Sequence, residues 1–97
     1  MPARAEIVGL KGDNLRFDCP GCREPHIVVV PPHPNAWDWN GDVQSPTLSP
    51  SILVQGGEND VRCHSFVRGG VIEFLLDCSH DLAGQSVQLP GAGAYGY

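Results

Sequence analysis

Residues 63–80, which read CHSFVRGGVIEFLLDCSH, contain the strongest fold signal in the sequence. Two apolar, strand-forming segments flank Gly69 and Gly70, and this pattern predicts a β-hairpin. A two-residue Gly-Gly turn matches the twist of paired strands, so Arg68 is expected to pair with Val71. A three-residue turn that includes Arg68 is the alternative register.

The register of this hairpin decides which donor side chains share a face. With the two-residue turn, side-chain alternation places Cys63, Cys78 and His80 on one face and directs His64 to the other. With the longer turn, His64 takes the place of Cys63 on that face. We prefer the first register, in which His64 is a packed histidine or supports a metal ligand rather than being one.

A second donor group lies nearer the N-terminus, in Cys19-Pro20-Gly21-Cys22. Pro presets the turn and Gly lets the chain reverse, so both thiols can aim at one point about 2.3 Å from each sulfur, as in zinc knuckles. The same spacing occurs in redox pairs, but those pairs begin a helix. Here the run 27–30 (IVVV) indicates a strand, which favours metal binding over a redox pair or a disulfide.

A closed tetrahedral metal site needs four ligands, and the two donor groups together can supply them. His33 lies in a proline-rich loop, and His26 is expected to bond nearby backbone, so both are weaker candidates. Cys78 is expected either as the fourth ligand, in place of His80, or as a buried free thiol. The sequence therefore predicts one structural Zn²⁺ held by residues drawn from Cys19, Cys22, Cys63, His80 and Cys78.

Length and composition indicate one small, β-rich domain. The chain has 97 residues, of which 41% are hydrophobic, enough for a single core. Its 12 Gly and 9 Pro residues indicate many turns and little long helix. The predicted fold is mainly β: a small, single-domain, antiparallel, zinc-ribbon-like fold built from short hairpins. The domain is expected to cover residues 1–90 and to be stabilised by the zinc site, and residues 91–97 are expected to form a glycine-rich tail.

Further strands are predicted outside the hairpin, where short apolar segments alternate with turn residues. The segment 26–30 does not alternate and is expected to be buried on both faces, while 46–54 contains two prolines and is expected at a sheet edge. Trp37 and Trp39 are expected to cover the core rather than form an exposed platform. The other predicted strands are 6–10, 15–19 and 86–90.

Charge and hydropathy exclude several classes of partner. The net charge is −5 at pH 7, from 6 Lys+Arg and 11 Asp+Glu, so few cations are available for a phosphate backbone and nucleic-acid binding is not expected. The longest apolar run, 27–30, is far shorter than the ~20 residues that span a membrane. Residues 1–6 lack the apolar core of a secretory signal, so secretion by such a signal is not expected.

Five segments form a pattern that extends over about residues 5–90: Cys19-Pro20-Gly21-Cys22, Trp39-Asn40-Gly41-Asp42, 46–51 (PTLSPS), 63–67 (CHSFV) and 78–85 (CSHDLAGQ). This pattern resembles a family of small phage and prophage proteins of unknown function, some of which bear the label "ammonia monooxygenase". The sequence gives that label no support, because it has no membrane span and no copper-type histidine cluster. The glycine-rich tail departs from the family pattern.

The resemblance has three implications for this chain. It implies a tailed-phage context, and hence a place in the host bacterial cytoplasm or in the virion. It implies a protein partner, either a virion component or a host protein. It also favours His80 as the fourth ligand, because the family pattern has serine at the position of Cys78 in some members while Cys63 and His80 are matched.

Two functions are weighed from the sequence. The first is a non-catalytic, zinc-stapled phage module that binds another protein as a virion-structural or accessory component, since a closed metal site contributes on the order of 10 kcal/mol to folding. The alternative is a zinc-dependent hydrolase acting on peptide or cell-wall substrates, with Glu73 as base and His64, His80, Asp77 and Asp81 close in sequence. The lack of a His-Glu-x-x-His motif favours the first, and homo-oligomerisation is left open.

Overall fold

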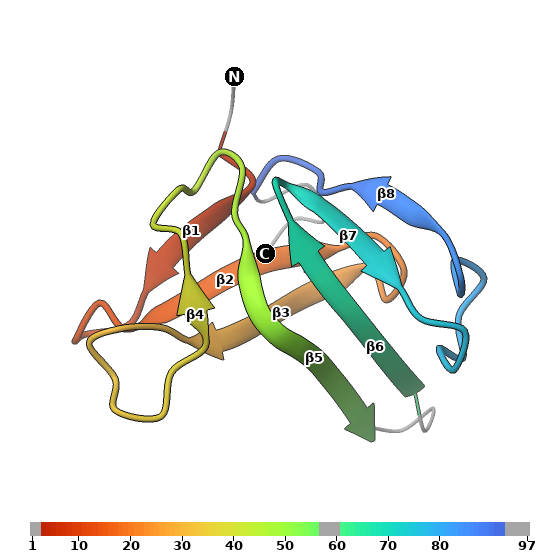
Figure 1. The fold of residues 1–97 in the computed structure, drawn as a ribbon, viewed down its shortest axis with the longest axis horizontal. Coiled ribbons are helices and arrows are strands. Elements are labelled where there is room, and N and C mark those ends of the chain that lie inside the picture. Colours follow the sequence, from red (N-terminus) through yellow and green to blue (C-terminus); the bar gives the residue numbers. More distant parts are fainter. Residues whose placement is uncertain (1–2, 57–60, 93–97) are drawn as a thin grey trace.

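The computed structural model describes residues 3–56 and 61–92, and in these residues the chain forms eight β-strands and no helix. The strands form two antiparallel sheets, one of three strands and one of five (Figure 1). The predicted mainly β, antiparallel fold is therefore confirmed. In chain order the strands are β1 (Ala5–Val8), β2 (Asn14–Cys19), β3 (Glu24–Val29), β4 (Asp38–Trp39), β5 (Leu48–Gly56), β6 (Val61–Arg68), β7 (Val71–Phe74) and β8 (Ser86–Gln88).

The three-stranded sheet has the order β1-β2-β3, with β2 in the middle. Leu15 in β2 lies opposite Ile7 on one side and Val28 on the other. The expectation that the third strand is buried on both faces is wrong: Val28 is 4% exposed but its neighbour Ile27 is 58% exposed. An antiparallel sheet can keep one face in water, and side-chain alternation then sorts even a run of apolar residues between the two faces.

The five-stranded sheet has the order β4-β5-β6-β7-β8 and contains the hairpin predicted from its Gly-Gly turn. Arg68 pairs with Val71, so the two-residue register is confirmed. Both turn glycines have positive φ, 58° at Gly69 and 80° at Gly70, as a type I′ turn requires. The strand after the turn ends at Phe74, earlier than expected, and the chain then continues as turns up to β8.

Strand β5 is irregular near its start. Leu48 pairs with Val67 and Ile52 with Ser65, so three residues of β5 lie opposite the single residue between those partners in β6. Such a bulge bends a strand and re-aims its side chains. The prediction of an edge strand is correct only for part of β5, because β4 pairs with its first two residues and with no later one.

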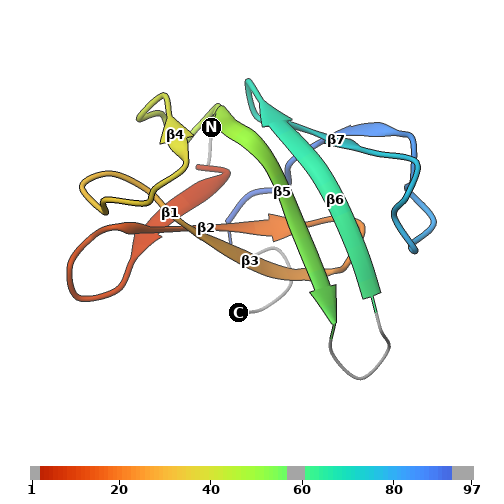
Figure 2. The same cartoon turned by 60° about the horizontal axis from the view of Figure 1, so that its bottom comes forward.

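The core lies between the two sheets, whose strands cross at a wide angle (Figure 2). It combines residues from both sheets, among them Leu15 and Phe17 from β2 and Ile52, Val67 and Ile72 from β5, β6 and β7. Trp37 and Trp39 pack against this cluster and are partly buried, so the expectation that they cover the core is met.

The N-terminal and C-terminal segments meet beside the sheets. The Ala92 N–H donates to the Ala3 carbonyl at 2.8 Å, which links the first and last described segments of the chain. Residues 93–97 of the predicted tail lie outside the described residues. Within the described ranges, none of the chain forms a helix with the length and apolar character that crossing a bilayer demands.

Candidate active site and metal centre

Four of the five predicted metal ligands come together between the sheets. Cys19 ends β2, Cys22 lies in the turn that follows, Cys63 is in β6, and His80 is in the turn region after β7. One ligand atom of each lies within 4.8 Å of those of the others, and the Sγ atoms of Cys19 and Cys63 are 3.8 Å apart. The group therefore joins the three-stranded sheet to the five-stranded one.

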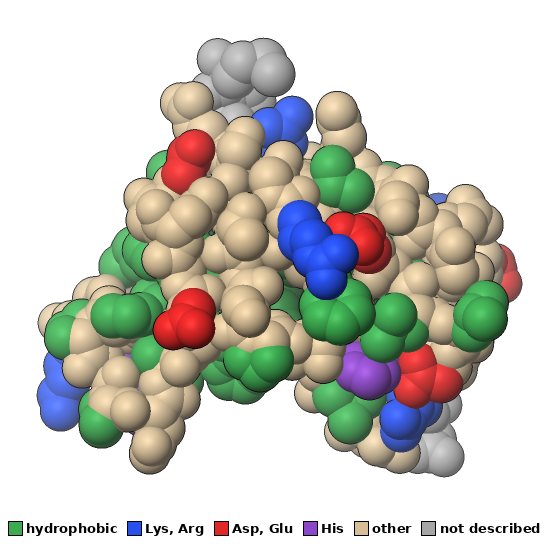
Figure 3. All heavy atoms as spheres, viewed as in Figure 1, with side chains coloured by type: hydrophobic (Ala, Val, Ile, Leu, Met, Phe, Trp, Pro, Cys, Tyr) green, Lys and Arg blue, Asp and Glu red, His purple; other side chains and the backbone are tan. Residues whose placement is uncertain are grey.

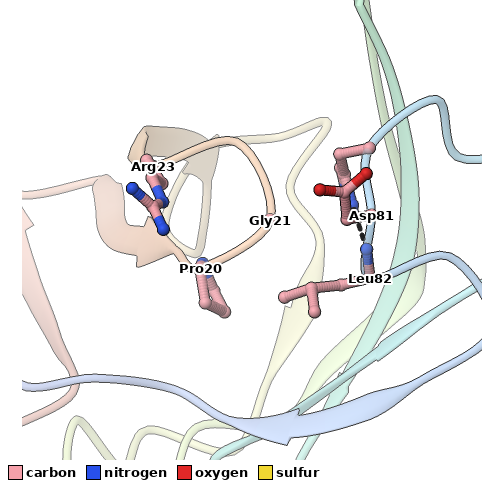
Figure 4. Close-up of a pocket in the computed structure, with 6 residues that line it drawn as sticks. Pro20, Gly21, Arg23, Asp81 and Leu82 are labelled. Atoms are coloured by element: carbon pink, nitrogen blue, oxygen red, sulfur yellow. Dashed lines mark hydrogen bonds between the residues drawn. The ribbon is translucent and has the colours of Figure 1, made fainter.

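The turn after β2 has the features of a metal knuckle. The Cys22 N–H donates to the Cys19 Sγ at 3.4 Å, which orients the first thiol. Gly21 faces the His80 ring so closely that a Cβ at this position would lie 2.3–2.7 Å from three of its atoms. Glycine is therefore needed here for close approach between two segments far apart in sequence. Figure 4 shows the loop with Gly21 opposite the segment of Asp81 and Leu82, across a cavity of about 360 Å³.

The three thiols of the group perturb one another's pKa values. The hydrogen bonds from Cys22 and Cys63 hold the pKa of the Cys19 thiol far below its ordinary value. The bond to Cys19 raises the pKa of Cys22 to about 12, and the same contact strongly raises that of Cys63. The three thiols therefore lie close enough to shift one another's pKa strongly. A bound cation would override these shifts, because coordination deprotonates thiols outright.

His80 is held in place and has one unsatisfied ring nitrogen. Its Nδ1 lies 3.2 Å from the Leu82 N–H, and its ring contacts Phe74 edge-on with centroids 4.5 Å apart. Its Nε2 is buried with no hydrogen-bond partner among the described residues. Three sulfurs and one imidazole nitrogen within 4.8 Å of one another fit a four-coordinate metal ion of the zinc type.

The fifth predicted ligand, Cys78, is not in the group. Its Sγ lies 3.2 Å from both the N–H and the carbonyl oxygen of His64, so it binds the main chain of β6 instead. Its 9% exposure fits the alternative of a buried free thiol. The expectation that the second strand of the hairpin stays extended as far as Cys78, on the same face as Cys63, is not met, because β7 ends at Phe74. His26 is buried beside Cys19 and lowers its pKa, but it too lies outside the group.

A second cluster of polar residues lies on the opposite face of the five-stranded sheet. The Ser51 Oγ is 3.1 Å from the His64 Nε2, and the His64 Nδ1 is 3.2 Å from the Asp77 Oδ2. A carboxylate can only accept, so Nδ1 carries the ring proton and Nε2 accepts from the serine hydroxyl. Hydroxyl, imidazole and carboxylate in this order form the arrangement by which serine hydrolases activate their nucleophile.

Each member of this triad is positioned by a distinct structural feature. Ser51 is the last residue of the β5 bulge, and His64 lies on the outward face of β6 with its side chain 25% exposed. Asp77 lies in the turn after β7, and Ser79 in the same turn is hydrogen-bonded to Arg62 in β6. There the Ser79 N–H donates to the Arg62 carbonyl at 2.8 Å, and the Arg62 N–H donates to the Ser79 Oγ at 2.9 Å.

The charge on Asp77 is stabilised by its neighbours. The Arg62 guanidinium donates to its Oδ2 at 2.8 Å, and this bond, followed by that from His64, lowers the pKa of Asp77 below its ordinary value of 3.8. The carboxylate is therefore ionised at neutral pH and able to orient the imidazole. The side chain is 40% exposed, so solvent shares this role. Figure 3 shows a histidine between hydrophobic, acidic and basic side chains on this open face.

Sequence reasoning missed this triad as a unit. The sequence suggests His64 as a packed histidine, as a residue in or beside the metal site, or, with Asp77, as part of a metal-dependent hydrolase, and it does not mark Ser51 as a candidate. The local segment Ser49-Pro50-Ser51 has no motif that marks a nucleophile, such as Gly-x-Ser-x-Gly. His64 and Asp77 lie close in sequence to the metal ligands Cys63 and His80. The sequence therefore suggests a single site, whereas the structure has a metal group and a separate polar cluster.

Comparison with known proteins identifies the family. The sequence model of a family described as bacterial ubiquitination-like system serine protease (BubE) matches residues 3–75, which include Ser51 and His64. Neither the characterised proteins nor the solved structures that were compared give a match. The expectation of a non-catalytic phage module is thereby corrected: the match is to a serine protease family of a bacterial system. The resemblance to phage proteins is not tested by this match and stays a prediction.

Proposed function

Because the chain belongs to the BubE family of bacterial ubiquitination-like system serine proteases, we propose that it hydrolyses peptide bonds with Ser51 as its nucleophile. The observation that carries this proposal is the Ser51–His64–Asp77 chain, with contacts of 3.1 and 3.2 Å. The family match covers the first two of these residues and ends at residue 75, so the assignment of Asp77 rests on geometry alone.

The reaction follows from the position of each atom. The Ser51 Oγ attacks the substrate carbonyl carbon while its proton moves to the His64 Nε2. The C–N bond then breaks, and His64 passes that proton to the leaving amine. Water attacks the resulting ester with His64 again as base, releasing the carboxylic acid and restoring the serine hydroxyl. Asp77 holds the ring tautomer and stabilises the imidazolium that forms in each half-reaction.

The alternative considered from the sequence, a zinc-dependent hydrolase acting on peptides, agrees with the family in its substrate class but not in its chemistry. The three thiols and His80 fill four positions and leave none for a reacting water. Glu73, the base of that hypothesis, is paired with Arg68 at 3.3 Å on the other side of the hairpin turn. A serine mechanism therefore accounts for more of the structure.

The metal centre then has a structural role. We propose one Zn²⁺ held by Cys19, Cys22, Cys63 and His80, which ties the two sheets together. The four ligand atoms lie within 4.8 Å of one another, and three cysteines with one histidine form a set that zinc prefers in closed sites. When bound, the ion supplies folding free energy and no reacting group.

The description of the family also suggests the kind of substrate. We propose that the substrate is a protein of a ubiquitination-like system, so that the predicted protein partner is a substrate rather than a virion component. The acidic net charge of −5 favours a partner with a basic surface.

The test is covalent labelling by a fluorophosphonate, which reacts with activated serine hydroxyls. We expect one adduct per chain, on Ser51, with loss of labelling in Ser51→Ala and in His64→Ala. Ser49→Ala is the matched control, because Ser49 lies in the same strand two residues away with an exposed side chain. Labelling of the intact protein at another residue, or none at all, would contradict the proposal.

A further inference from the structure

We propose that the open edge of β5, from Ile52 to Gln55, is the substrate-docking strand, and that the substrate polypeptide binds there in extended form beside Ser51. This inference rests on the proposed protease function and specifies the conformation and local character of the substrate. It places an apolar substrate side chain beside Leu53.

The edge of β5 is open where it approaches the nucleophile. β4 pairs with Leu48 and Ser49 only, and β6 pairs with the opposite edge of β5. From Pro50 to Gly56 no strand of the described residues pairs with the outer edge, as Figures 1 and 2 show in two orientations. An edge of this kind is a template on which an extended chain can add as a further strand.

The main-chain groups of this edge can be assigned from the β6 side. The His64 carbonyl accepts from the Leu75 N–H at 2.9 Å, and its N–H bonds to the Cys78 Sγ, so the His64 main chain faces away from β5. Leu53 lies directly opposite His64. In an antiparallel pair, opposite residues exchange both main-chain bonds or neither. Leu53, and Gln55 two residues later, therefore direct N–H and C=O towards the open edge.

The triad is oriented for attack from the same side. His64 lies in β6, so its Nε2 approaches the Ser51 Oγ from the paired side of β5. The side of the hydroxyl that faces the open edge is left for a substrate carbonyl. The Trp37 Nε1 donates to the Ser51 carbonyl at 3.4 Å, so the indole of Trp37 marks the end of the edge beyond the nucleophile.

Leu53 gives this edge a preference for apolar substrate residues. Its side chain is 48% exposed and shares the outward face with its cross-strand neighbour His64. An added strand would place alternate side chains on this face, one of them against Leu53. Main-chain bonds then supply general affinity for extended chains, and Leu53 supplies a local preference.

The first experiment removes one outward N–H. Leu53→Pro deletes a donor that no β6 residue uses, so the β5–β6 ladder keeps its bonds. The probes are a mixture of unstructured synthetic tetradecapeptides, read by mass spectrometry, and a fluorophosphonate, which needs no docking strand. We expect kcat/KM for the peptides to fall at least tenfold while the labelling rate of Ser51 stays within twofold of the unmodified protein.

The second experiment changes the side chain and keeps the N–H. We expect Leu53→Lys to move the cleavage preference at one substrate position from apolar to acidic residues. Ile27→Lys is the matched control, since Ile27 is a comparably exposed aliphatic residue on the other sheet, and its replacement is expected to leave the preference unchanged. If circular dichroism shows that Leu53→Pro does not fold, the comparison of Leu53→Lys with Ile27→Lys tests the docking strand instead.

The outcomes separate the two proposals. If Ser51 is labelled but neither Leu53 variant alters peptide cleavage, the docking strand is wrong and the protease assignment stands. If the unmodified protein is not labelled and cuts no peptide, both proposals fall together.

Discussion

Cys63 and His64 are neighbours in β6 that serve two different sites. The Cys63 side chain is 1% exposed and faces the metal group between the sheets, while the His64 side chain is 25% exposed and faces Ser51 and Asp77. Alternation along one strand thus places a donor of the metal group and the base that we propose for catalysis back to back. Any shift of β6 at Cys63 moves His64 as well.

The carboxylate of Asp77 is expected to be needed for catalysis rather than folding. Asp77→Asn leaves an amide that can bond either ring tautomer of His64, so kcat is expected to fall by roughly 10²- to 10⁴-fold, with the melting temperature little changed. Steady-state kinetics on a cleaved peptide measure this. Asp81→Asn is the control, because Asp81 lies beside the cavity near His80 and outside the triad. An equal loss in both variants would contradict the assignment.

Loss of one metal donor is expected to unfold the protein. Cys63→Ser removes a ligand from a site that contributes on the order of 10 kcal/mol, comparable with the whole stability of a small domain. Inductively coupled plasma mass spectrometry is expected to find one zinc per chain in the unmodified protein and none in this variant. Cys78→Ser is expected to keep its zinc and to lose about 1 kcal/mol, from weaker bonds to the His64 main chain. Zinc loss in Cys78→Ser alone would overturn the ligand assignment.

Gly21 is expected to tolerate no side chain. A Cβ there would lie 2.3–2.7 Å from the His80 ring, so Gly21→Ala is expected to displace that ring and to weaken zinc binding at least tenfold. Competition with a chromogenic chelator measures the affinity. Pro20→Ala, in the same loop, is the control. Unchanged affinity in Gly21→Ala would show that His80 is not a ligand in solution.

Arg62 is expected to control the ionisation of Asp77. Its bond lowers the pKa of Asp77 below 3.8. A lowered pKa in the folded protein means that the pair stabilises the fold above the unfolded pKa and that this contribution is lost as pH falls through the folded pKa. Carbon-13 titration of the carboxyl group is expected to give a value below 3.8, and a higher value in Arg62→Gln. If the pKa of Asp77 is the same in the unmodified protein and in Arg62→Gln, the shift is due to the hydrogen bond from His64, which has the smaller effect of the two.

The sequence predicts those parts of the structure that depend on local geometry. Gly69 and Gly70 fix the hairpin register, and Cys19 and Cys22 predict the knuckle, because both signals come from residues within one turn. The fourth donor, His80, was one of two alternatives, because its position depends on where β7 ends. That end is set by turns that bond back to β6, and strand alternation does not reveal it.

The triad depends on long-range pairing that no local pattern contains. Ser51 reaches His64 because a bulge displaces it within β5, and Asp77 reaches the same ring because the turn after β7 is bonded to Arg62. An exposed serine and an exposed aspartate are ordinary surface residues in a sequence. Only the pairing of β5 with β6, together with the bonding of the turn after β7 to β6, gives them a common partner.

The three side chains that we propose for catalysis all come from one stretch of the polypeptide, positions 51 to 77, and β1 to β3 contribute none of them. The first half of the chain supports these residues indirectly, through Cys19 and Cys22 at the metal group and through Trp37, which donates to the Ser51 carbonyl. Selection can therefore remodel the outer face of that half, including Ile7 and Ile27, to suit new neighbours without altering the chemistry. Lineages of this protein should differ most there, while the knuckle stays fixed.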